Sequence, residues 1–539
     1  MKPPCLVYED GHLLVVNKPP GLNTHAPSPF AGEGLYEWLR HREPRWAQLA
    51  IIHRLDKETS GLIVFSKTAE ANRSLTEQFT HRHVKKTYVL LTNRSIASRA
   101  FTLRTRLVRI GDRYISRSSE SGAQIAETRF RELEVPAPGQ QEQRVLWQAE
   151  PVTGRTHQIR VHAAEAGIPI LGDVRYGGTP ARRLCLHAAE LRFAHPVSQE
   201  ELRFHAPADF LANPTLSLRQ ALIDPRSTTA FRLVHGQSDG WPGCYVDVLG
   251  PYLLAQSAQA LTREQSATLA ELAAGMTSKA AYYKRLVTSP RAVEQSEVSP
   301  KLLFGSPAPE RFTVLENSLT FELCFNEGYS VGLFLDQRDN RRRLLSGHVA
   351  AGFELFEIDQ LNSASKPEVL NAFAYTCGFS VCAAKRGALT TSLDLSKKYL
   401  EWGKRNFLAN GIDVAGHDFV FGDVFDWLGR FNKRSRRFDV ILLDPPTFSR
   451  SKEFGPFRAS KDYSKLVAAA LPLLKTGGVL FASCNTAAWP PEEFLKSIKT
   501  PVHAAKRAIL QEQYFPQPPD FPVSRAEPAY LKTVWLRAR

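Results

Sequence analysis

The sequence lacks the features that mark exported, membrane-spanning or metal-binding chains. Its seven cysteines are odd in number and widely spaced, and no CxxC pair is matched by a second pair, so we expect reduced thiols and no metal site. No apolar run approaches the roughly 18 residues of a membrane span. The N-terminus shows no signal-peptide pattern. These absences predict a cytoplasmic protein without a membrane or metal partner; they leave protein partners undefined.

The sequence also lacks internal repeats, low-complexity tracts and any surplus of acidic residues. Lys and Arg number 69 against 54 Asp and Glu, which gives a formal charge of +15 over 539 residues. The hydrophobic fraction of 43% and the charged fraction of 23% are ordinary for globular proteins, which excludes disorder. A basic surplus favours a polyanionic partner, most commonly nucleic acid, although a solvated basic surface is the alternative.

The length predicts two to four domains, and the pattern of apolar runs changes along the chain. Short runs bounded by Gly, Pro and Asn predict strands up to about residue 210, with a helix over Ala69–Phe79. Strands alternate with helices after residue 311, which is typical of a parallel sheet. The predicted strands include Leu13–Asn17, Leu62–Phe65, Thr87–Leu91, Gln158–His162, Leu184–His187, Leu191–Phe193, Tyr245–Val248, Tyr252–Gln256, Val369–Ala372, Thr390–Leu393, Val440–Leu443 and Val479–Ser483.

We therefore predict a multidomain chain of the α+β and α/β classes. Residues 1–210 form a core with a mixed or antiparallel sheet, and the proline-containing stretch 211–227 is a linker. Residues 228–310 form a small α/β module. Residues 311–539 form a doubly wound, Rossmann-like domain.

The first group of candidate residues surrounds Asp56. This acid lies between Arg54 and Lys57, and nearby positive charge keeps a carboxylate ionised. Taken alone, the tetrapeptide His53-Arg54-Leu55-Asp56 is more typical of a solvated surface turn. A second segment, Val152–His162, alternates apolar and polar residues, which predicts a strand carrying Gln158 and Arg160 on one face. A row of Gln, Arg and His side chains suits contacts to phosphates and bases.

Together these segments resemble the RluA family of RNA pseudouridine synthases over about residues 5–205. The matching motifs are Tyr8–Asp10, Val15–Gly21, His53–Leu62, Lys86–Tyr88, Gly154–His162, Gly172-Asp173 and Tyr176-Gly177.

The resemblance implies that Asp56 is the nucleophile of a cofactor-independent isomerisation of uridine. It also implies that Tyr88 packs against the base and helps to remove the C5 proton. Either Arg155 or Arg160 pairs with Asp56, and Arg54 fills the space of the flipped nucleotide. Extrusion of a base costs a few kcal/mol, which pocket contacts must offset. We expect His157 and Gln158 to contact the RNA.

The second group of candidate residues follows the predicted strands of the C-terminal region. Leu370–Ser380 runs from a strand into a helix, and Asp394 follows about 20 residues later, as in nucleotide-cofactor sites. One glycine is far from GxGxxG, so a helix-capping turn is the alternative. Asp423 follows another strand, and Asp444-Pro445-Pro446 ends the next one. Consecutive prolines stop a strand at the sheet edge where ligands bind.

Residues from about 228 to 539 resemble S-adenosylmethionine-dependent ribosomal RNA methyltransferases of the RlmI and RlmK type. Further matching segments are Phe231–Gly236, Asp239–Gly243, Gly332–Arg341 and Tyr530–Lys532. The resemblance implies that Asp394 binds the ribose, that Asp423 lies near the adenine, and that Asp444 to Phe448 hold the target base. The implied cofactor-binding residues are Phe373, Tyr375, Thr376, Gly378, Asp394, Asp423 and Asp444, and the implied base-binding residues are Pro445, Pro446 and Phe448.

Two methylation chemistries stay open, and Cys484 separates them. It follows a predicted strand in Ser483-Cys484-Asn485, in register with the Ser-Cys-Ser of the cytosine-C5 branch, where a thiolate must activate the base. The stretch Asp444–Ser449 with Ser451-Lys452, and Asn485, look closer to the guanine-N7 branch, which needs no thiol. Buried cysteines are also commonly inert. We favour cytosine C5.

The interpretation is a bifunctional RNA-modifying enzyme. Its N-terminal half isomerises uridine, and its C-terminal half methylates a base of large-subunit rRNA from S-adenosylmethionine. In the alternative, one half is active and the other serves as an RNA-binding or ribosome-assembly module.

Overall fold

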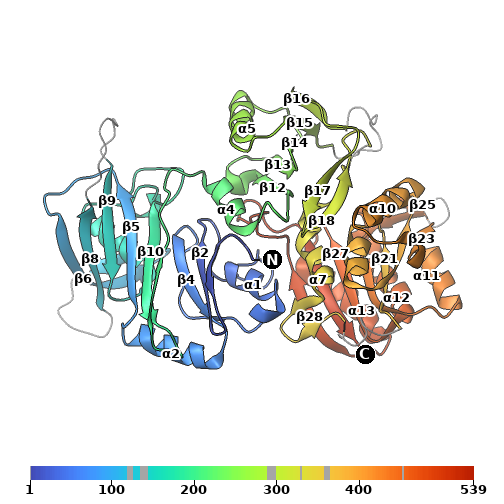
Figure 1. Cartoon of the computed structure of the whole chain (residues 1–539), viewed down its shortest axis with the longest axis horizontal. Helices are drawn as coiled ribbons and strands as arrows, with labels where there is room; N and C mark the ends of the chain where they lie inside the picture. The colour runs from blue at the N-terminus through green and yellow to red at the C-terminus, as the bar shows by residue number, and fades with distance from the viewer. Residues whose placement is uncertain are drawn as a thin grey trace. The chain divides into compact units, whose positions relative to one another are not determined.

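The computed structural model describes residues 2–117, 125–133, 144–287, 299–327, 330–356, 365–451 and 455–539. It divides into two compact units, drawn in Figure 1. Unit 1 comprises residues 1–25, 34–36 and 48–224, and unit 2 comprises residues 26–33, 37–47 and 225–539. None of the described helices is both long and apolar enough to cross a membrane. The domain boundaries given above stay predictions.

Unit 1 is built on an eleven-stranded sheet (Figure 1). The main order is β1-β2-β4-β10-β5-β9-β8-β6-β7, with β3 beside β4 and β11 beside β10. Among the described pairings of this sheet, β4 with β10 is the parallel one, so the sheet is mixed, as predicted. The strands are β1 Leu6–Glu9, β2 Leu13–Lys18, β3 Ala50–Ile51, β4 Ser60–Ser66, β5 Lys85–Thr92, β6 Ala100–Ile110, β7 Arg113–Arg117, β8 Ile125–Leu133, β9 Val145–Pro151, β10 Leu186–Ala194 and β11 Glu201–His205.

Helix α2 (Ala69–Thr80) confirms the helix predicted over Ala69–Phe79. Its Thr68 N-cap accepts a hydrogen bond from the Ala71 amide, the usual device for starting a helix. The two short strands predicted over Leu184–His187 and Leu191–Phe193 are one strand, β10, that begins at Leu186. The 3-10 helix η2 covers Val174–Tyr176.

The strand predicted over Gln158–His162 is wrong, because these residues lie in helix α3 (Gln158–Glu165). His157 adopts a left-handed conformation (φ 57°) just before the helix. Residues 158–163 are all buried, so the helix has no exposed polar face and shows no helical period in sequence. Residues two apart on a helix point about 200° apart, so Gln158 and Arg160 do not share a face.

Most of the predicted linker forms helix α4 (Pro214–Leu222). The Asn213 side chain caps it by accepting from the Thr215 and Leu216 amides. Pro214 occupies the first helical position, where a missing N–H costs nothing. Pro214, one of the prolines that suggested a linker, therefore marks the start of a helix.

Unit 2 contains a five-stranded sheet in the order β12-β13-β14-β15-β16. Helix α5 (Arg263–Gly275) connects the parallel strands β14 and β15, and a hairpin of β17 and β18 follows. The predicted strands Tyr245–Val248 and Tyr252–Gln256 lie within β13 and β14. The strands are β12 Ala230–His235, β13 Cys244–Leu249, β14 Tyr252–Ser257, β15 Ala280–Arg285, β16 Lys301–Gly305, β17 Phe312–Glu316 and β18 Leu319–Leu323.

Unit 2 also contains a seven-stranded sheet in the order β23-β22-β21-β24-β27-β29-β28 (Figure 1). The five strands from β23 to β27 are parallel, and β29 runs antiparallel to both neighbours. This confirms the doubly wound domain. The strands are β21 Glu368–Ala372, β22 Leu389–Asp394, β23 Asp418–Phe421, β24 Phe438–Leu443, β27 Leu474–Cys484, β28 Ile509–Phe515 and β29 Lys532–Ala538.

The order of the parallel strands reverses between β21 and β24, and ligands bind at such a switch point, outside the carboxyl ends of the strands. The helices after the strands are α9 Gly378–Arg386, α10 Lys397–Ala409, α11 Val424–Lys433, α12 Ala459–Ala470 and α13 Pro491–Ala504. The remaining elements of unit 2 are η5 Leu335–Gln337, α7 Arg338–Ser346, β19 His348–Ala350, β20 Phe353–Glu354, β25 Phe448–Ser451 and β26 Gly455–Arg458.

Residues 37–47 pack inside unit 2 against helix α7. The indole of Trp38 is buried and donates a hydrogen bond to Asp339 (3.1 Å). Arg342 forms an ion pair with Glu43. The guanidinium of Arg42 stacks on the Trp38 ring at 4.7 Å. An N-terminal segment thus helps to cover helix α7, whose five charged residues are all buried.

Candidate functional sites

Asp56 lies in the loop between β3 and β4, and buried hydrogen bonds hold this loop in place. The ammonium of Lys18 is fully buried and donates to the carbonyl oxygens of Pro19 (2.9 Å), Leu22 (2.8 Å) and Lys57 (3.0 Å). Burial lowers the pKa of Lys18 to about 7. These three hydrogen bonds fix the backbone next to Asp56.

Arg160 joins Asp56 to a second carboxylate, Asp173. Its Nε and Nη2 donate to the two oxygens of Asp173, both at 2.7 Å, in the bidentate geometry that fits guanidinium to carboxylate. Its Nη1 lies 3.4 Å from Oδ2 of Asp56. Burial acts to lower the Arg160 pKa, but the hydrogen bond and charge of Asp173 outweigh it and raise this pKa. Of the two predicted arginines, Arg160 is therefore the one that reaches Asp56.

His157 is the second group beside Asp56. Its Nε2 lies 3.7 Å from Oδ2 of Asp56, and its Nδ1 lies 2.7 Å from the Tyr176 hydroxyl. That hydroxyl accepts from the Tyr114 amide, so Tyr176 can donate to Nδ1 and leave the ring proton on Nε2, facing Asp56. Burial lowers the His157 pKa, against the opposing effect of Asp56, which favours the neutral ring at pH 7.

Tyr88 lies on β5, where burial and then the charge of Asp56 raise its pKa. Its phenol therefore stays protonated and can pack or donate without adding charge. Arg54 and Arg155 are exposed.

Gln158 is buried, and its amide is used within the protein: Oε1 accepts from the Thr153 hydroxyl and the Arg155 amide, and Nε2 donates to Glu127 and Thr128. The structure thus does not present Gln158 to a ligand as the strand prediction had expected.

Asp173, Tyr176 and Lys18 have contacts that the sequence interpretation did not anticipate. All three belong to quoted motifs, but none received a role. Asp173 is 2% exposed, and a buried acid almost always has a cationic partner. That requirement pairs Asp173 with an arginine, although the sequence does not show which one.

In unit 2, the loop from β21 to α9 is strained where the candidate cofactor residues lie. Phe373, Tyr375 and Cys377 have positive φ values of 66°, 49° and 61°, and each such residue costs of order 1–3 kcal/mol. Alternating left-handed residues turn successive amides toward one concave side, which suits an anionic or polar ligand. Thr376 is buried and donates to the Gly332 carbonyl (2.6 Å), which anchors the loop.

Asp394 ends β22 beside this loop. Its two carboxylate oxygens each accept a backbone amide, from Tyr375 and from Ser396, both at 2.8 Å. Burial raises its pKa in spite of these bonds. Asp394 pairs in register with Phe421 of β23, and the neighbouring Leu395 and Phe421 side chains are 43% and 49% exposed. An acid beside an exposed apolar pair fits the ribose and adenine of a nucleoside; sequence inspection missed both apolar residues.

Asp423 lies at the start of α11. Its Oδ1 accepts from the Phe425 and Asp426 amides, so this oxygen caps the helix. The preceding Gly422 donates its amide to the Asp394 carbonyl (3.0 Å). The candidate residues Asp394 and Asp423 therefore follow adjacent strands at one edge of the sheet.

Asp444 ends β24, on the other side of the switch point from Asp394. Gln337 donates to Asp444 Oδ1 (3.2 Å) and to the Ser483 hydroxyl (2.7 Å). Burial raises the pKa of Asp444 to about 6. The buried Tyr463 hydroxyl lies 3.0 Å from the Leu443 carbonyl and accepts from the Ser483 amide, which ties together the ends of β24 and β27.

The residues around Asp444 differ in exposure. Pro445 is buried, while Pro446 and Phe448 are exposed. Asn485 is exposed and accepts from the Thr447 hydroxyl (2.7 Å). Cys484 is only 1% exposed, and its Sγ lies 3.3 Å from the Thr486 hydroxyl. Lys452, which contributed to the guanine-N7 resemblance, lies outside the described residues.

Comparisons with known proteins match the two regions of the chain that contain these candidate sites. The RNA pseudouridylate synthase family matches residues 12–165, and the S-adenosylmethionine-dependent methyltransferase family matches residues 232–537. The ribosomal large subunit pseudouridine synthase C of Yersinia pestis is 41% identical over 218 residues, which cover 38% of this chain and 66% of that protein, just under two thirds of its length. The synthase of the same name from Vibrio cholerae is 39% identical over 227 residues, covering 40% of this chain and 70% of the relative.

The C-terminal region has relatives of a different kind. The ribosomal RNA large subunit methyltransferase I of Aeromonas salmonicida is 30% identical over 326 residues, which cover 60% of this chain and 78% of that protein.

The fold and the sites define an enzyme with two catalytic parts, an isomerase and a methyltransferase. The chain belongs to the RNA pseudouridylate synthase family through its N-terminal region and to the S-adenosylmethionine-dependent methyltransferase family through its C-terminal region. Both resemblances drawn from the motifs are thereby confirmed, and the methyltransferase cofactor is S-adenosylmethionine.

Proposed function

We propose that this enzyme modifies large-subunit ribosomal RNA twice, by isomerising a uridine and by methylating a cytosine at C5. The relatives of both halves carry the ribosomal large subunit in their names, and the methyltransferase relative also names ribosomal RNA, which supports one RNA as the substrate of both. The observation that carries the isomerase is the position of Asp56 beside Arg160 and His157. The observation that carries the methyltransferase is the pair of sites, Asp394 and Asp444, on either side of the switch point.

In the isomerase, Asp56 attacks the ribose of the target uridine, and the bond from ribose to N1 breaks. The base rotates, C5 bonds to the ribose as Asp56 leaves, and the C5 proton is lost while N1 gains one. Arg160 orients the Asp56 carboxylate, since Asp173 holds its guanidinium in place. Tyr88, kept neutral by its raised pKa, packs against the base.

Arg54, Arg155 and His157 are the other side chains that we propose to contact the RNA. Arg54 precedes Asp56 by two residues and is exposed, so it can fill the space that the flipped nucleotide leaves. Arg155 is exposed just before α3 and can reach a phosphate. We assign Gln158 to fixing the 153–155 turn, because its amide is used within the protein.

In the methyltransferase, the Phe373–Gly378 loop surrounds the methionine part of the cofactor and Asp394 binds its ribose. Asp423 and the exposed apolar side chains of Leu395 and Phe421 lie near the adenine. When bound, the cofactor supplies an electrophilic methyl group. Asp444, with Pro445, Pro446 and Phe448, holds the target base; Asp444 also contributes to the cofactor site.

We propose cytosine C5 as the methyl acceptor because Cys484 ends β27 directly after Ser483, which shares Gln337 with Asp444. Its thiolate would add to C6 of the base and make C5 nucleophilic. Guanine N7 is the second candidate. The burial of Cys484 and the exposure of Asn485 favour it, since a nucleophilic thiol has to reach the base.

Mapping of ribosomal RNA tests both halves at once. Cells without the gene are complemented with the wild-type, Asp56→Asn or Asp394→Ala protein, and their rRNA is analysed by mass spectrometry. We expect Asp56→Asn to lose one pseudouridine and keep the methyl group, and Asp394→Ala to do the reverse. The modification that each variant keeps shows that the protein is expressed and that its unchanged half is folded. Unchanged rRNA in both would contradict the proposal.

A further inference from the structure

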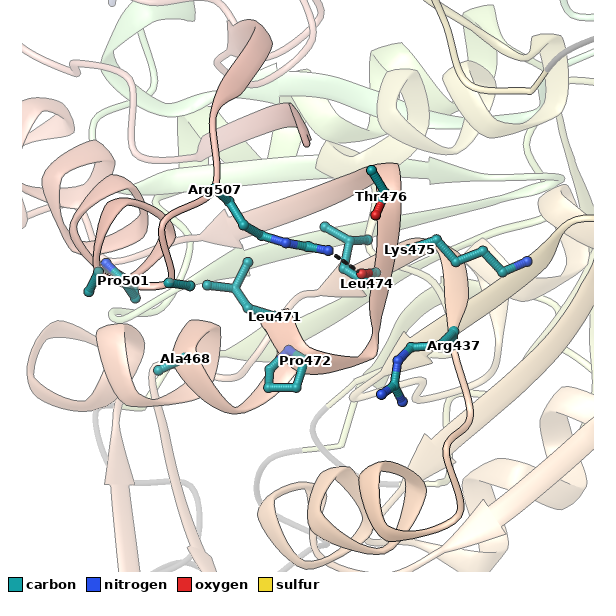
Figure 2. Close-up of a pocket in the computed structure, with 11 residues that line it drawn as sticks. Arg437, Ala468, Leu471, Pro472, Leu474, Lys475, Thr476, Pro501 and Arg507 are labelled. Atoms are coloured by element: carbon teal, nitrogen blue, oxygen red, sulfur yellow. Dashed lines mark hydrogen bonds between the residues drawn. The ribbon is translucent and has the colours of Figure 1, made fainter.

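Figure 2 shows a cavity of about 620 Å³. It lies at the opposite end of the methyltransferase sheet from Asp394 and Asp444. Its lining includes Arg437, just before β24, and Leu474 and Lys475 at the start of β27. The amino ends of these two strands pair with each other. β24 is six residues long, so its two ends are separated by about 20 Å. The cavity is therefore distinct from the candidate methyl-transfer site.

The lining combines an apolar surface with three cations. Ala468, Leu471, Pro472, Pro501 and Ala504 supply apolar atoms, and Figure 2 shows Arg507, Lys475 and Arg437 around Leu471 and Pro472. The volume falls within the range of small-ligand pockets, about 300–1,000 Å³.

Two of the three cations have no carboxylate partner among the described residues. Lys475 pairs with Asp439 (2.8 Å), but Arg437 donates only to the Arg436 carbonyl (2.8 Å) in the described part of the chain. Arg507 donates through Nη2 to the Leu474 carbonyl, while its buried Nη1 has no hydrogen-bond partner among the described residues. A buried donor without a partner costs about 1–3 kcal/mol, so an anion that accepted from Arg507 would relieve this cost.

The surrounding sequence adds to the positive charge. Arg437 ends the run Lys433-Arg434-Ser435-Arg436-Arg437, and Lys506 precedes Arg507. Within this run, Arg436 is neutralised by Asp418 and Glu368. Arg437 and Arg507 thus remain to bind an anion, beside the apolar surface of Leu471 and Pro472.

We propose that this cavity binds one nucleotide of the RNA, with its phosphate between Arg437 and Arg507 and its base against Leu471 and Pro472. The proposal rests on RNA as the substrate of the enzyme. The site lies about one strand length from the proposed position of the target base, so the nucleotide that it holds would belong to a flanking part of the RNA. Contacts to the phosphate of this nucleotide would carry no sequence information. Free nucleotides share this chemistry and are the other source of such a ligand.

The test measures binding of a labelled single-stranded RNA of mixed sequence to the full-length protein as salt is raised. The variants are Arg437→Gln, which removes an exposed side chain, and the double variant with Arg507→Gln. Arg263→Gln, an exposed arginine on α5, is the matched control, and thermal unfolding checks that each variant is folded. Loss of one phosphate contact should lower the slope of log affinity against log salt by about 0.7.

A lower slope in Arg437→Gln and in the double variant, but not in Arg263→Gln, would support the proposal. A wild-type slope in Arg437→Gln would overturn it while leaving RNA as the substrate. Absence of RNA binding by the wild-type protein would overturn the proposed function as well. Uridine 5′-monophosphate is tested separately by calorimetry. If it binds as tightly as the RNA and loses binding in the double variant, the site belongs to a free nucleotide.

Discussion

The guanidinium of Arg160 forms a bidentate ion pair with Asp173, and this pair leaves one nitrogen of Arg160 to face Asp56 at 3.4 Å. Asp173 therefore acts on the proposed nucleophile through Arg160. The chain places the two carboxylates far apart in sequence, in the loop before β4 and in the turn before η2.

We expect Asp173→Asn to reduce isomerisation although it leaves Asp56 unchanged. The amide would offer Arg160 a donor in place of an acceptor, and loss of one charged partner costs about 1.5–3 kcal/mol, which is roughly 10-fold or more in rate. Tritium release from C5-labelled uridine RNA measures the rate. Asp112→Asn, at an exposed acid, is the control. A wild-type rate for Asp173→Asn would show that Arg160 needs no second carboxylate.

Cys484→Ala distinguishes the two methylation chemistries. If cytosine C5 is the target, the variant should lose methyl transfer, and the wild-type enzyme should trap 5-fluorocytosine RNA covalently. Cys382→Ala, which removes another buried thiol of unit 2, should keep activity. Retained transfer by Cys484→Ala, with 7-methylguanosine as the product, would establish the N7 branch; the stability loss should then stay within a few kcal/mol.

Methyl transfer should depend on the ionisation of Asp444. Burial raises its pKa to about 6, so the carboxylate is ionised above this pH and protonated below it. If the charged form holds the base, single-turnover rates should fall as the pH drops below about 6. Asp444→Asn should be slower and show no such step. A wild-type profile that is flat between pH 5 and 8 would contradict a role for the charged form.

The same pKa also affects stability. Because the folded-state pKa lies above the ordinary aspartate value of 3.8, the folded protein binds more protons than the unfolded chain between pH 4 and 6. Stability from this group therefore falls as pH rises through that window. Asp444→Asn should raise the unfolding free energy at pH 7 by at most about 3 kcal/mol. Urea unfolding at pH 4 and pH 7 measures the difference, and a destabilised variant at pH 7 would refute it.

Trp38→Ala should destabilise unit 2. The indole is 3% exposed and bonded to Asp339, and removal of a buried tryptophan costs about 3–5 kcal/mol. Trp38→Phe keeps most of the volume and should cost less, about 1–3 kcal/mol, for the lost hydrogen bond to Asp339. Urea unfolding of the full chain measures both. An unfolding transition of unit 2 that neither substitution shifts would show that residues 37–47 are dispensable for it.

Sequence motifs predicted Asp394 and Asp444 at the ends of strands, where the structure has them, and the motif His53–Leu62 singled out Asp56; the roles of all three stay predictions. The motifs were insufficient for Arg160: a helix buried on all sides has no 3.6-residue pattern, and five alternating residues resemble a strand. Gln337 was missed as a positioning group because its partner Asp444 is 107 residues away, and Asp173 was missed because the sequence does not show which arginine pairs with it. Leu395 and Phe421 were missed because an apolar residue at a strand end usually belongs to the core, and only their exposure sets them apart.

The membership of residues 37–47 in unit 2 bears on how the chain is made. Trp38 and its partner Asp339 are 301 residues apart, and a ribosome synthesises the N-terminal one first. The strands of unit 1 can pair while Trp38 is still without its buried environment. Helix α7 emerges only later, with most of unit 1 already complete. A ribosome that stops between the two units would therefore release a chain in which the indole of Trp38 still lacks its hydrogen-bond partner in helix α7.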